Sequence, residues 1–159
     1  MFAYVCLGTN DMERSCRYYD AVLGTLGYSR CDTGDEPNWE GWAGWGTYDD
    51  HGRRQDALWV CLPFDKQPAS VGNGTMIALK ASSWRQVNEF FAATLANGGT
   101  SEGAPGLRLE YNPDFYACYV RDPDGNKLAV VCRGFAAPQD DRADRRPQQL
   151  TVYAPPSRV

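Results

Sequence analysis

Two stretches decide the fold: YVCLGTNDMERSCRYYDAVLGTLG at residues 4–27, and MIALKASSWRQVNEFFAATLANGG at residues 76–99. They are offset by 76 − 4 = 72 residues and align without a gap. Four features match at this offset: a polar residue (Asn10, Ser82), an aromatic pair (Tyr18-Tyr19, Phe90-Phe91), a leucine (Leu23, Leu95) and a terminal glycine (Gly27, Gly99). Four matches in register indicate a duplicated structural unit.

Each copy opens with a strand-length apolar run and continues into a helix signal. Apolar residues at helical spacing predict helices over about 11–24 and 84–97. A polar residue and a Glu or Gln stand at capping-box spacing at both starts, Asn10 with Glu13 and Ser83 with Gln86. Glycines after each helix supply the positive φ with which helices end.

Strand signals follow each helix. They cover about 28–32, 42–48 and 57–62 in the first half, and 100–102, 115–121 and 127–132 in the second. The last two are joined by DPDGN at 122–126, whose Pro, Gly and Asn favour a tight turn. Each half therefore reads βαβββ, and one half cannot bury its sheet face alone. We predict an α+β domain over 1–133, with units at about 1–63 and 75–133.

Composition excludes several classes of protein. The net charge of −4 and the pI of about 4.9 argue against nucleic-acid binding, which needs a basic face. No apolar run approaches the roughly 20 residues that span a bilayer, and the start shows no secretory signal, so a cytoplasmic protein is expected. The six cysteines form no C-x-x-C pair, which favours reduced, buried thiols. Residues 134–159 read as a polar extension, in which the strand-like stretch 149–153 could dock on this chain or a neighbour.

These residues resemble a known family. The opening VCLGTNDMERSCRYYDAVLGTLGY resembles the first module of the vicinal oxygen chelate superfamily of glyoxalases, bleomycin resistance proteins and extradiol dioxygenases, and GNGTMIAL with RDPDGNK resembles the second. The resemblance covers about 1–133. It implies tandem βαβββ modules whose curled mixed sheets form a bowl, frequent pairing into homodimers, and a divalent metal held by His, Gln or Glu.

The family's metal-ligand positions carry other residues here. Carried over one by one, the positions fall on Tyr4, Met76, Ala129 and, with one residue of doubt, Leu58. Leu, Met and Ala offer no donor that a hard divalent cation accepts, and Tyr could serve only as a phenolate. We therefore expect no metal and no cofactor. Cys6, two residues along the first strand, is the one plausible soft donor.

Without metal, the bowl is expected to bind a small, partly aromatic organic molecule. The candidate ligand-binding residues are Tyr4, Leu58, Trp59, Met76, Tyr111, Tyr116 and Ala129. Tyr116 and Tyr119 alternate on one strand, so one of the two faces inward. Trp39, Trp42 and Trp45 form either a loop over the bowl mouth or a packed β-bulge.

Evidence for catalysis in the sequence is weak. Glu110 is a possible general base, although a solvated loop carboxylate is the commoner role for such a residue. His51, the only histidine, follows two aspartates in a loop that fixes no metal geometry and supplies no catalytic relay. The leading hypothesis is thus a binding protein without metal-dependent activity. The alternatives are a lactoylglutathione lyase-like enzyme or dioxygenase, and a structural or regulatory homodimer without ligand.

Overall fold

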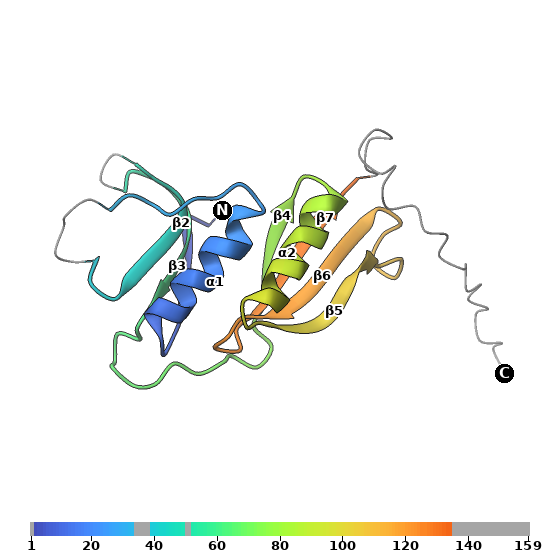
Figure 1. The fold of residues 1–159 in the computed structure, drawn as a ribbon. Coiled ribbons are helices and arrows are strands. Elements are labelled where there is room, and N and C mark those ends of the chain that lie inside the picture. The colour runs from blue at the N-terminus through green and yellow to red at the C-terminus, as the bar shows by residue number, and fades with distance from the viewer. Residues whose placement is uncertain (1, 34–38, 50–51, 135–159) are drawn as a thin grey trace.

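The computed structural model describes residues 2–33, 39–49 and 52–134. Its elements run in the order β1 (Tyr4–Gly8), α1 (Met12–Gly24), β2 (Trp42–Asp49), β3 (Arg54–Cys61), β4 (Ile77–Ala81), α2 (Trp84–Ala96), β5 (Thr100–Leu107), β6 (Phe115–Arg121) and β7 (Lys127–Arg133). Figure 1 shows two sheets side by side, each with one helix across the same face. Among the described residues, no helix is long and apolar enough to span a membrane.

Both sheets are mixed, and they share a pattern. The first has the order β1-β3-β2 and the second β4-β7-β6-β5. In each, the first strand of the unit pairs in parallel with the last, as Cys6 with Trp59 and Ala78 with Ala129. Cys6 and Ala78 are 72 residues apart, so the two parallel pairings involve equivalent residues of the sequence repeat. The α+β fold class with two curled mixed sheets is confirmed.

The two helices match their predicted positions to within a residue, but the first cap differs. Asp11, not Asn10, is the N-cap of α1, and its side chain accepts from the Arg14 backbone N–H at 3.0 Å. Asn10 is instead engaged with Ala69, exchanging two hydrogen bonds of 3.0 and 2.8 Å with its backbone. Ser83 caps α2 as expected, while Gln86 reaches the Ser82 rather than the Ser83 N–H.

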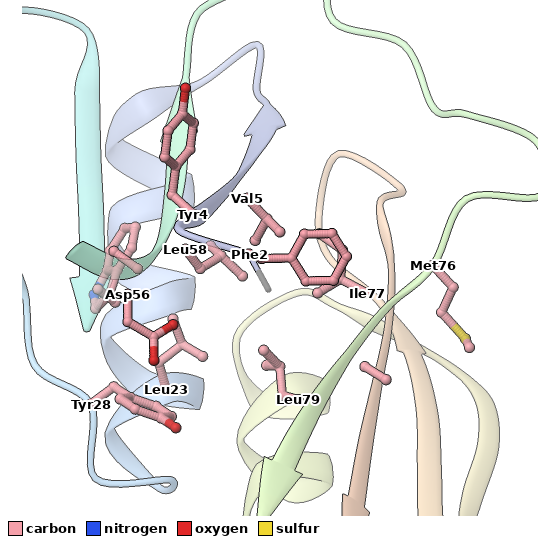
Figure 2. A pocket seen from close by; sticks show the side chains of 13 residues that line it. Phe2, Tyr4, Val5, Leu23, Tyr28, Asp56, Leu58, Met76, Ile77 and Leu79 are labelled. Atoms are coloured by element: carbon pink, nitrogen blue, oxygen red, sulfur yellow. The ribbon is translucent and has the colours of Figure 1, made fainter. Parts of the chain in front are cut away.

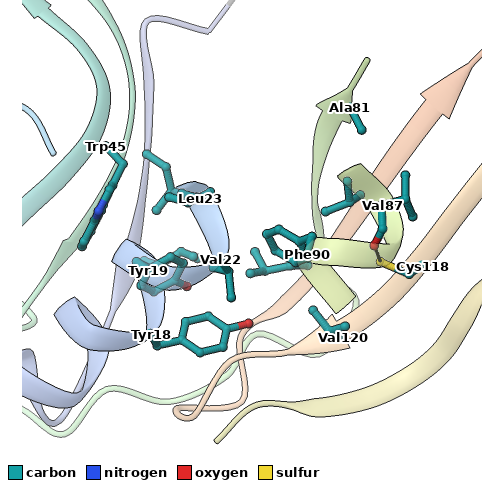
Figure 3. Close-up of a cluster of buried hydrophobic side chains, with 14 of the residues drawn as sticks. Tyr18, Tyr19, Val22, Leu23, Trp45, Ala81, Val87, Phe90, Cys118 and Val120 are labelled. Carbon is teal, nitrogen blue, oxygen red and sulfur yellow. Dashed lines mark hydrogen bonds between the residues drawn. The ribbon is translucent and has the colours of Figure 1, made fainter. Parts of the chain in front are cut away.

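The core lies between the helices and the sheets, and it continues from one unit to the other where α1 meets α2 (Figure 3). Tyr18 and Tyr19 of α1 are fully buried and pack edge to face at 5.0 Å. Phe90 of α2 and Val120 of β6 are equally buried in the same cluster. Apolar burial at these positions joins the two units into one packed body.

A polar contact reinforces this junction. The DPDGN turn between β6 and β7 reaches the start of α1, where Asp124 accepts from the Thr9 hydroxyl at 2.7 Å and the Arg14 guanidinium at 2.7 Å. Asp122 is buried and accepts from the Tyr19 hydroxyl at 2.7 Å. The two turn carboxylates therefore have structural roles: they hold the turn of the second unit against α1.

Two predicted strands and the interpretation of the tryptophan segment need correction. Segment 28–32 forms no ladder: it makes one bridge, from Arg30 to Trp45 on β2. The weak prediction at 100–102 is an eight-residue edge strand, β5, with two register shifts against β6. The Trp42–Trp45 step is neither a loop nor a bulge, since both residues lie in regular register on β2 and point to opposite faces.

Candidate functional site

Each sheet has one face against its helix and one turned away, which we call the open face. On β6 the residues Tyr116, Cys118 and Val120 are buried toward α2, so Phe115 and Tyr119 lie on the open face. The register then places Lys127, Ala129 and Arg133 of β7 on the same face. The open faces are the candidate sites because the helices cover the other side.

The open face of the second sheet holds a hollow of about 570 Å³, the second-sheet hollow. Its lining combines aromatic rings, a thioether and charged groups: Met76, Glu102, Tyr111, Phe115, Tyr119, Lys127 and Arg133. Tyr111 and Phe115 pack edge to face at 5.3 Å, so their rings brace each other at one wall. Its volume is in the range of small-molecule sites.

The charged groups of this hollow are paired unevenly. Glu102 accepts from Lys127 at 2.7 Å and from Arg121 at 2.5 Å, so one carboxylate is shared by two cations. The Lys127 ammonium, followed by the Arg121 guanidinium, holds the pKa of Glu102 below its ordinary value. Arg133 pairs with Asp114 at 3.3 Å and lies over the Phe115 ring at 5.3 Å. The hollow therefore offers positive charge beside aromatic surface.

A second, smaller hollow of about 310 Å³ lies between β1 and β4, the edge strands of the two sheets. Figure 2 shows Val5 of β1 and Leu58 of β3 on one side, and Ile77 and Leu79 of β4 on the other. Phe2 extends between them. The remaining lining includes Tyr4, Tyr28 from the end of α1, Asp56 and Met76. Met76 thus borders both hollows.

The open face of the first sheet is filled by its own aromatic side chains. Trp59 is 1% exposed and stacks on Trp39, with ring centroids 4.7 Å apart, while Tyr48 meets Trp59 edge-on at 5.5 Å. Gly44, opposite Trp59 on β2, leaves room for the indole, because a Cβ there would lie 2.5 Å from the ring. Tyr48, Trp39 and Trp59 fill the open face of the first sheet, whereas the open face of the second sheet holds a hollow.

The sequence-predicted site residues are distributed over these regions. Tyr4, Leu58 and Met76 line the hollow between β1 and β4, and Tyr111 lines the second-sheet hollow. Ala129 lies on the second open face between Ala78 and Tyr119, whereas Trp59 belongs to the filled first face.

Three other candidates lie elsewhere. Tyr116 points toward α2, stacked on Trp84 at 4.3 Å and donating to Asn88 at 3.0 Å, so Tyr119 is the tyrosine of this strand on the open face. Glu110 is exposed in the turn before β6 and lines neither hollow. His51 lies outside the described residues.

The charged residues of the second-sheet hollow were missed as ligand-binding candidates. Lys127 precedes Ala129 by two residues on the same strand, so strand alternation alone would have placed it on the same face. Glu102 carried no such signal, because it lies on β5 at the register shift between Ser101 and Gly103, where simple alternation does not assign a face.

Comparisons with known proteins agree with this architecture. The family model for the Glyoxalase/Bleomycin resistance protein/Dioxygenase superfamily matches residues 2–130. The chain belongs to this superfamily. A crystal structure of a glyoxalase/bleomycin resistance protein from Albidiferax ferrireducens is 36% identical, with a TM-score of 0.70, over 84% of this chain and 99% of that one.

More distant structures share the fold. A glyoxalase-related enzyme from Fulvimarina pelagi is 19% identical over 84% of this chain and 88% of that chain, with a TM-score of 0.60. Glyoxalase I from Zea mays is 22% identical, with a TM-score of 0.55, and the match covers 82% of this chain and 45% of that longer one. No curated protein matches the chain.

The four positions that the family resemblance assigns to metal ligands can be compared with the strand register. Tyr4 and Met76 stand at equivalent places in the two repeats. Ala129 pairs with Ala78, and Cys6, the equivalent of Ala78, pairs with Trp59, so Trp59 rather than Leu58 is the structural equivalent of Ala129. Phenol, thioether, methyl and indole groups do not fit a hard divalent cation. Among the described residues, no group of three or more His, Cys, Asp or Glu is arranged to hold a metal ion.

Proposed function

We propose that the protein binds a flat, partly aromatic organic molecule carrying an anionic group, in the second-sheet hollow and without a metal. The observation that carries this proposal is the lining itself: three aromatic rings and Met76 stand beside Lys127 and Arg133. Aromatic walls supply contact area, and a few polar groups fix the orientation of a ligand.

The charges favour an anion. Glu102 already accepts from two cations, so a ligand carboxylate, sulfonate or phosphate near Lys127 would relieve an excess of positive charge. The Tyr119 hydroxyl adds a neutral donor, because a phenol is protonated near neutral pH, and burial raises its pKa further. An anion approaching Lys127 and Tyr119 therefore meets donors.

The residues at the four family metal positions support binding rather than metal-dependent chemistry. Tyr4, Leu58, Met76 and Ala129 provide no set of imidazole and carboxylate ligands, and Trp59 beside Leu58 adds none. Groups that orient such ligands cannot substitute for them. Within residues 2–33, 39–49 and 52–134, no group of three or more His, Cys, Asp or Glu could hold a metal for a lyase or dioxygenase of the metal-dependent kind.

The probe for this proposal is 8-anilinonaphthalene-1-sulfonate, a flat aromatic anion whose fluorescence rises on binding. We expect saturable binding by the full chain. Phe115→Ala removes a ring contact worth about 1 kcal/mol and should weaken binding about five-fold. Lys127→Gln should weaken it by a similar factor and reduce its salt dependence.

Two controls separate this hollow from other apolar surface. Tyr28→Ala alters the hollow between β1 and β4, and Phe64→Ala removes a ring that is 97% exposed and lines neither hollow. Both should bind the probe like the parent protein. Binding that is insensitive to Phe115→Ala and Lys127→Gln but lost in Tyr28→Ala would move the site to the other hollow and contradict the proposal.

Elemental analysis tests the absence of metal dependence. Untagged protein dialysed against trace Zn²⁺, Ni²⁺, Mn²⁺ and Fe²⁺ should retain none at stoichiometric level. Near-stoichiometric metal that disappears in Tyr4→Phe or Glu110→Gln would restore the enzymatic alternative. Metal that survives both substitutions would place a site elsewhere and equally contradict a metal-free protein.

We also propose that two copies of the chain form a homodimer, because curled sheets leave edge strands that need covering. Tyr4, Met76 and Tyr111 are 54%, 44% and 64% exposed, which leaves large apolar groups for a partner to cover. Light scattering at tens of micromolar should give twice the chain mass of 17.7 kDa. A single species of the chain mass would rule the dimer out.

A further inference from the structure

Two thiols touch on the open face of the first sheet. Cys6 on β1 and Cys61 at the end of β3 are separated by 55 residues in sequence, and their Sγ atoms are 3.3 Å apart. The register pairs Cys6 with Trp59 and Cys61 with Gly8, so the thiols are diagonal neighbours on adjacent parallel strands.

Solvent reaches one member of this pair. Cys6 is exposed, contrary to the expectation of buried cysteines, while Cys61 is 7% exposed. Cys118 and Cys132 are buried on the helix side of the second sheet. The Cys6–Cys61 pair therefore combines two adjacent sulfur atoms with a route for an ion to enter.

We propose that Cys6 and Cys61 form a two-sulfur binding site for a soft, closed-shell cation of the Cu⁺ and Ag⁺ type. Thiolates select such ions, whereas hard divalent cations prefer oxygen and imidazole ligands. The proposal is independent of the organic ligand proposed above, because the pair lies on the other sheet.

The geometry suits low coordination. With metal–sulfur bonds of about 2.3 Å, a linear arrangement separates the sulfur atoms by about 4.6 Å. The observed 3.3 Å must therefore widen, and rotation of the exposed Cys6 side chain provides this while the buried Cys61 stays in place. Each thiol releases one proton to the buffer, two sulfur lone pairs form the bonds to the metal, and no group is oxidised or reduced.

The thiol chemistry makes the site selective. A thiol must lose its proton to bind a metal, and an ordinary thiol is largely protonated near neutral pH. Only a cation with a high affinity for sulfur displaces those protons there.

Silver ion tests the site, because it does not change its oxidation state under these conditions. The reduced, full-length chain is equilibrated with Ag⁺ in excess 2-mercaptoethanol, desalted, and analysed for bound silver. Two preorganised thiols should hold Ag⁺ on the order of 100-fold more tightly than one, since the second bond is intramolecular. We expect one Ag⁺ per chain, lost in both Cys6→Ser and Cys61→Ala.

Matched variants keep the result interpretable. Cys16→Ser and Cys31→Ser change half-buried thiols outside the pair and should retain the bound silver. Cys6→Ser changes an exposed side chain, and its circular dichroism should match the parent protein even if Cys61→Ala is destabilised. The proposal is overturned if Cys6→Ser holds Ag⁺ as well as the parent protein does. It is also overturned if 2-mercaptoethanol removes silver from the parent protein as readily as from Cys6→Ser.

Discussion

Asp124 offers the sharpest test of how the two units are joined. Its side chain is 4% exposed and accepts from the Thr9 and Ser15 hydroxyls at 2.7 and 3.1 Å, the Asn10 backbone N–H at 3.0 Å, and the Arg14 guanidinium at 2.7 Å. All four donors come from the segment that opens α1, so one carboxylate binds the second unit to the first. We therefore expect Asp124→Asn to destabilise the protein strongly.

The magnitude follows from the contacts. Hydrogen bonds to a charged group contribute about 1.5–3 kcal/mol each, but an Asn carbonyl can still accept two of them. Removing one partner of a buried ion pair costs about 3–5 kcal/mol, and Arg14 is 39% exposed, which lets the freed guanidinium rehydrate. We expect a loss of about 3 kcal/mol, or about 10 °C in Tm. Urea unfolding followed by circular dichroism measures it.

The matched control is Arg14→Gln, which leaves the other three donors on Asp124. Because this arginine is 39% exposed, the loss should be about 1 kcal/mol or less. If Asp124→Asn unfolds within 0.5 kcal/mol of the parent, about a sixth of the value argued above, the reasoning from these contacts is refuted.

The same carboxylate predicts a pH dependence. Burial raises its pKa, but hydrogen bonds from Thr9, Asn10 and Arg14 outweigh this and lower the pKa below its ordinary value. The stabilisation is complete above the unfolded-state pKa of about 3.9 and is lost as the pH falls toward the folded-state pKa. The unfolding free energy of Asp124→Asn should therefore fall less steeply below about pH 4 than that of the parent. Equal slopes would contradict the assignment.

Two further substitutions test the core and the first open face. Tyr19→Phe removes a buried hydrogen bond of 2.7 Å to the Asp122 carboxylate and should cost about 1.5–3 kcal/mol, seen as a lower urea midpoint with an unchanged m-value. Gly44→Ala places a Cβ 2.5 Å from the Trp59 ring and should cost about 1–3 kcal/mol, whereas Gly24→Ala, with no heavy atom within 4 Å, should be neutral or stabilising. Thermal unfolding that ranks the two alanine variants in the opposite order would contradict the close packing of Trp59.

The repeat made most of the fold predictable, because both copies carry the same local signals. The repeat was less informative where a contact with a residue distant in sequence competes with a local structural signal. Asn10 fits a capping pattern, but the structure uses it to hold Ala69 and leaves the cap to Asp11. The segment around Arg30 has strand composition, yet it makes only a single bridge to Trp45. Local propensity cannot resolve such competition, since the deciding partner is distant in sequence.

The sheet face on which a strand side chain lies was hard to predict for a different reason. A strand alternates its side chains, so a register uncertainty of one residue exchanges the two faces. The candidate Leu58 illustrates this, because Leu58 packs in the core whereas its neighbour Trp59 lies on the open face. The same uncertainty left Tyr116 and Tyr119 indistinguishable until the pairing of β6 with β7 was known.

The strand register shows how two equivalent positions of the duplicated units differ. Trp59 and Ala129 occupy equivalent places in the two sheets, one the bulkiest side chain and the other among the smallest. On the first sheet the indole, stacked on Trp39 and accommodated by Gly44, fills the open face. On the second, Ala129 has only a methyl group and is 1% exposed, and the hollow of that face is lined by its neighbour Tyr119. Since neither residue binds metal, size is the property that distinguishes the two positions, and it favours the second sheet as the place where a ligand binds.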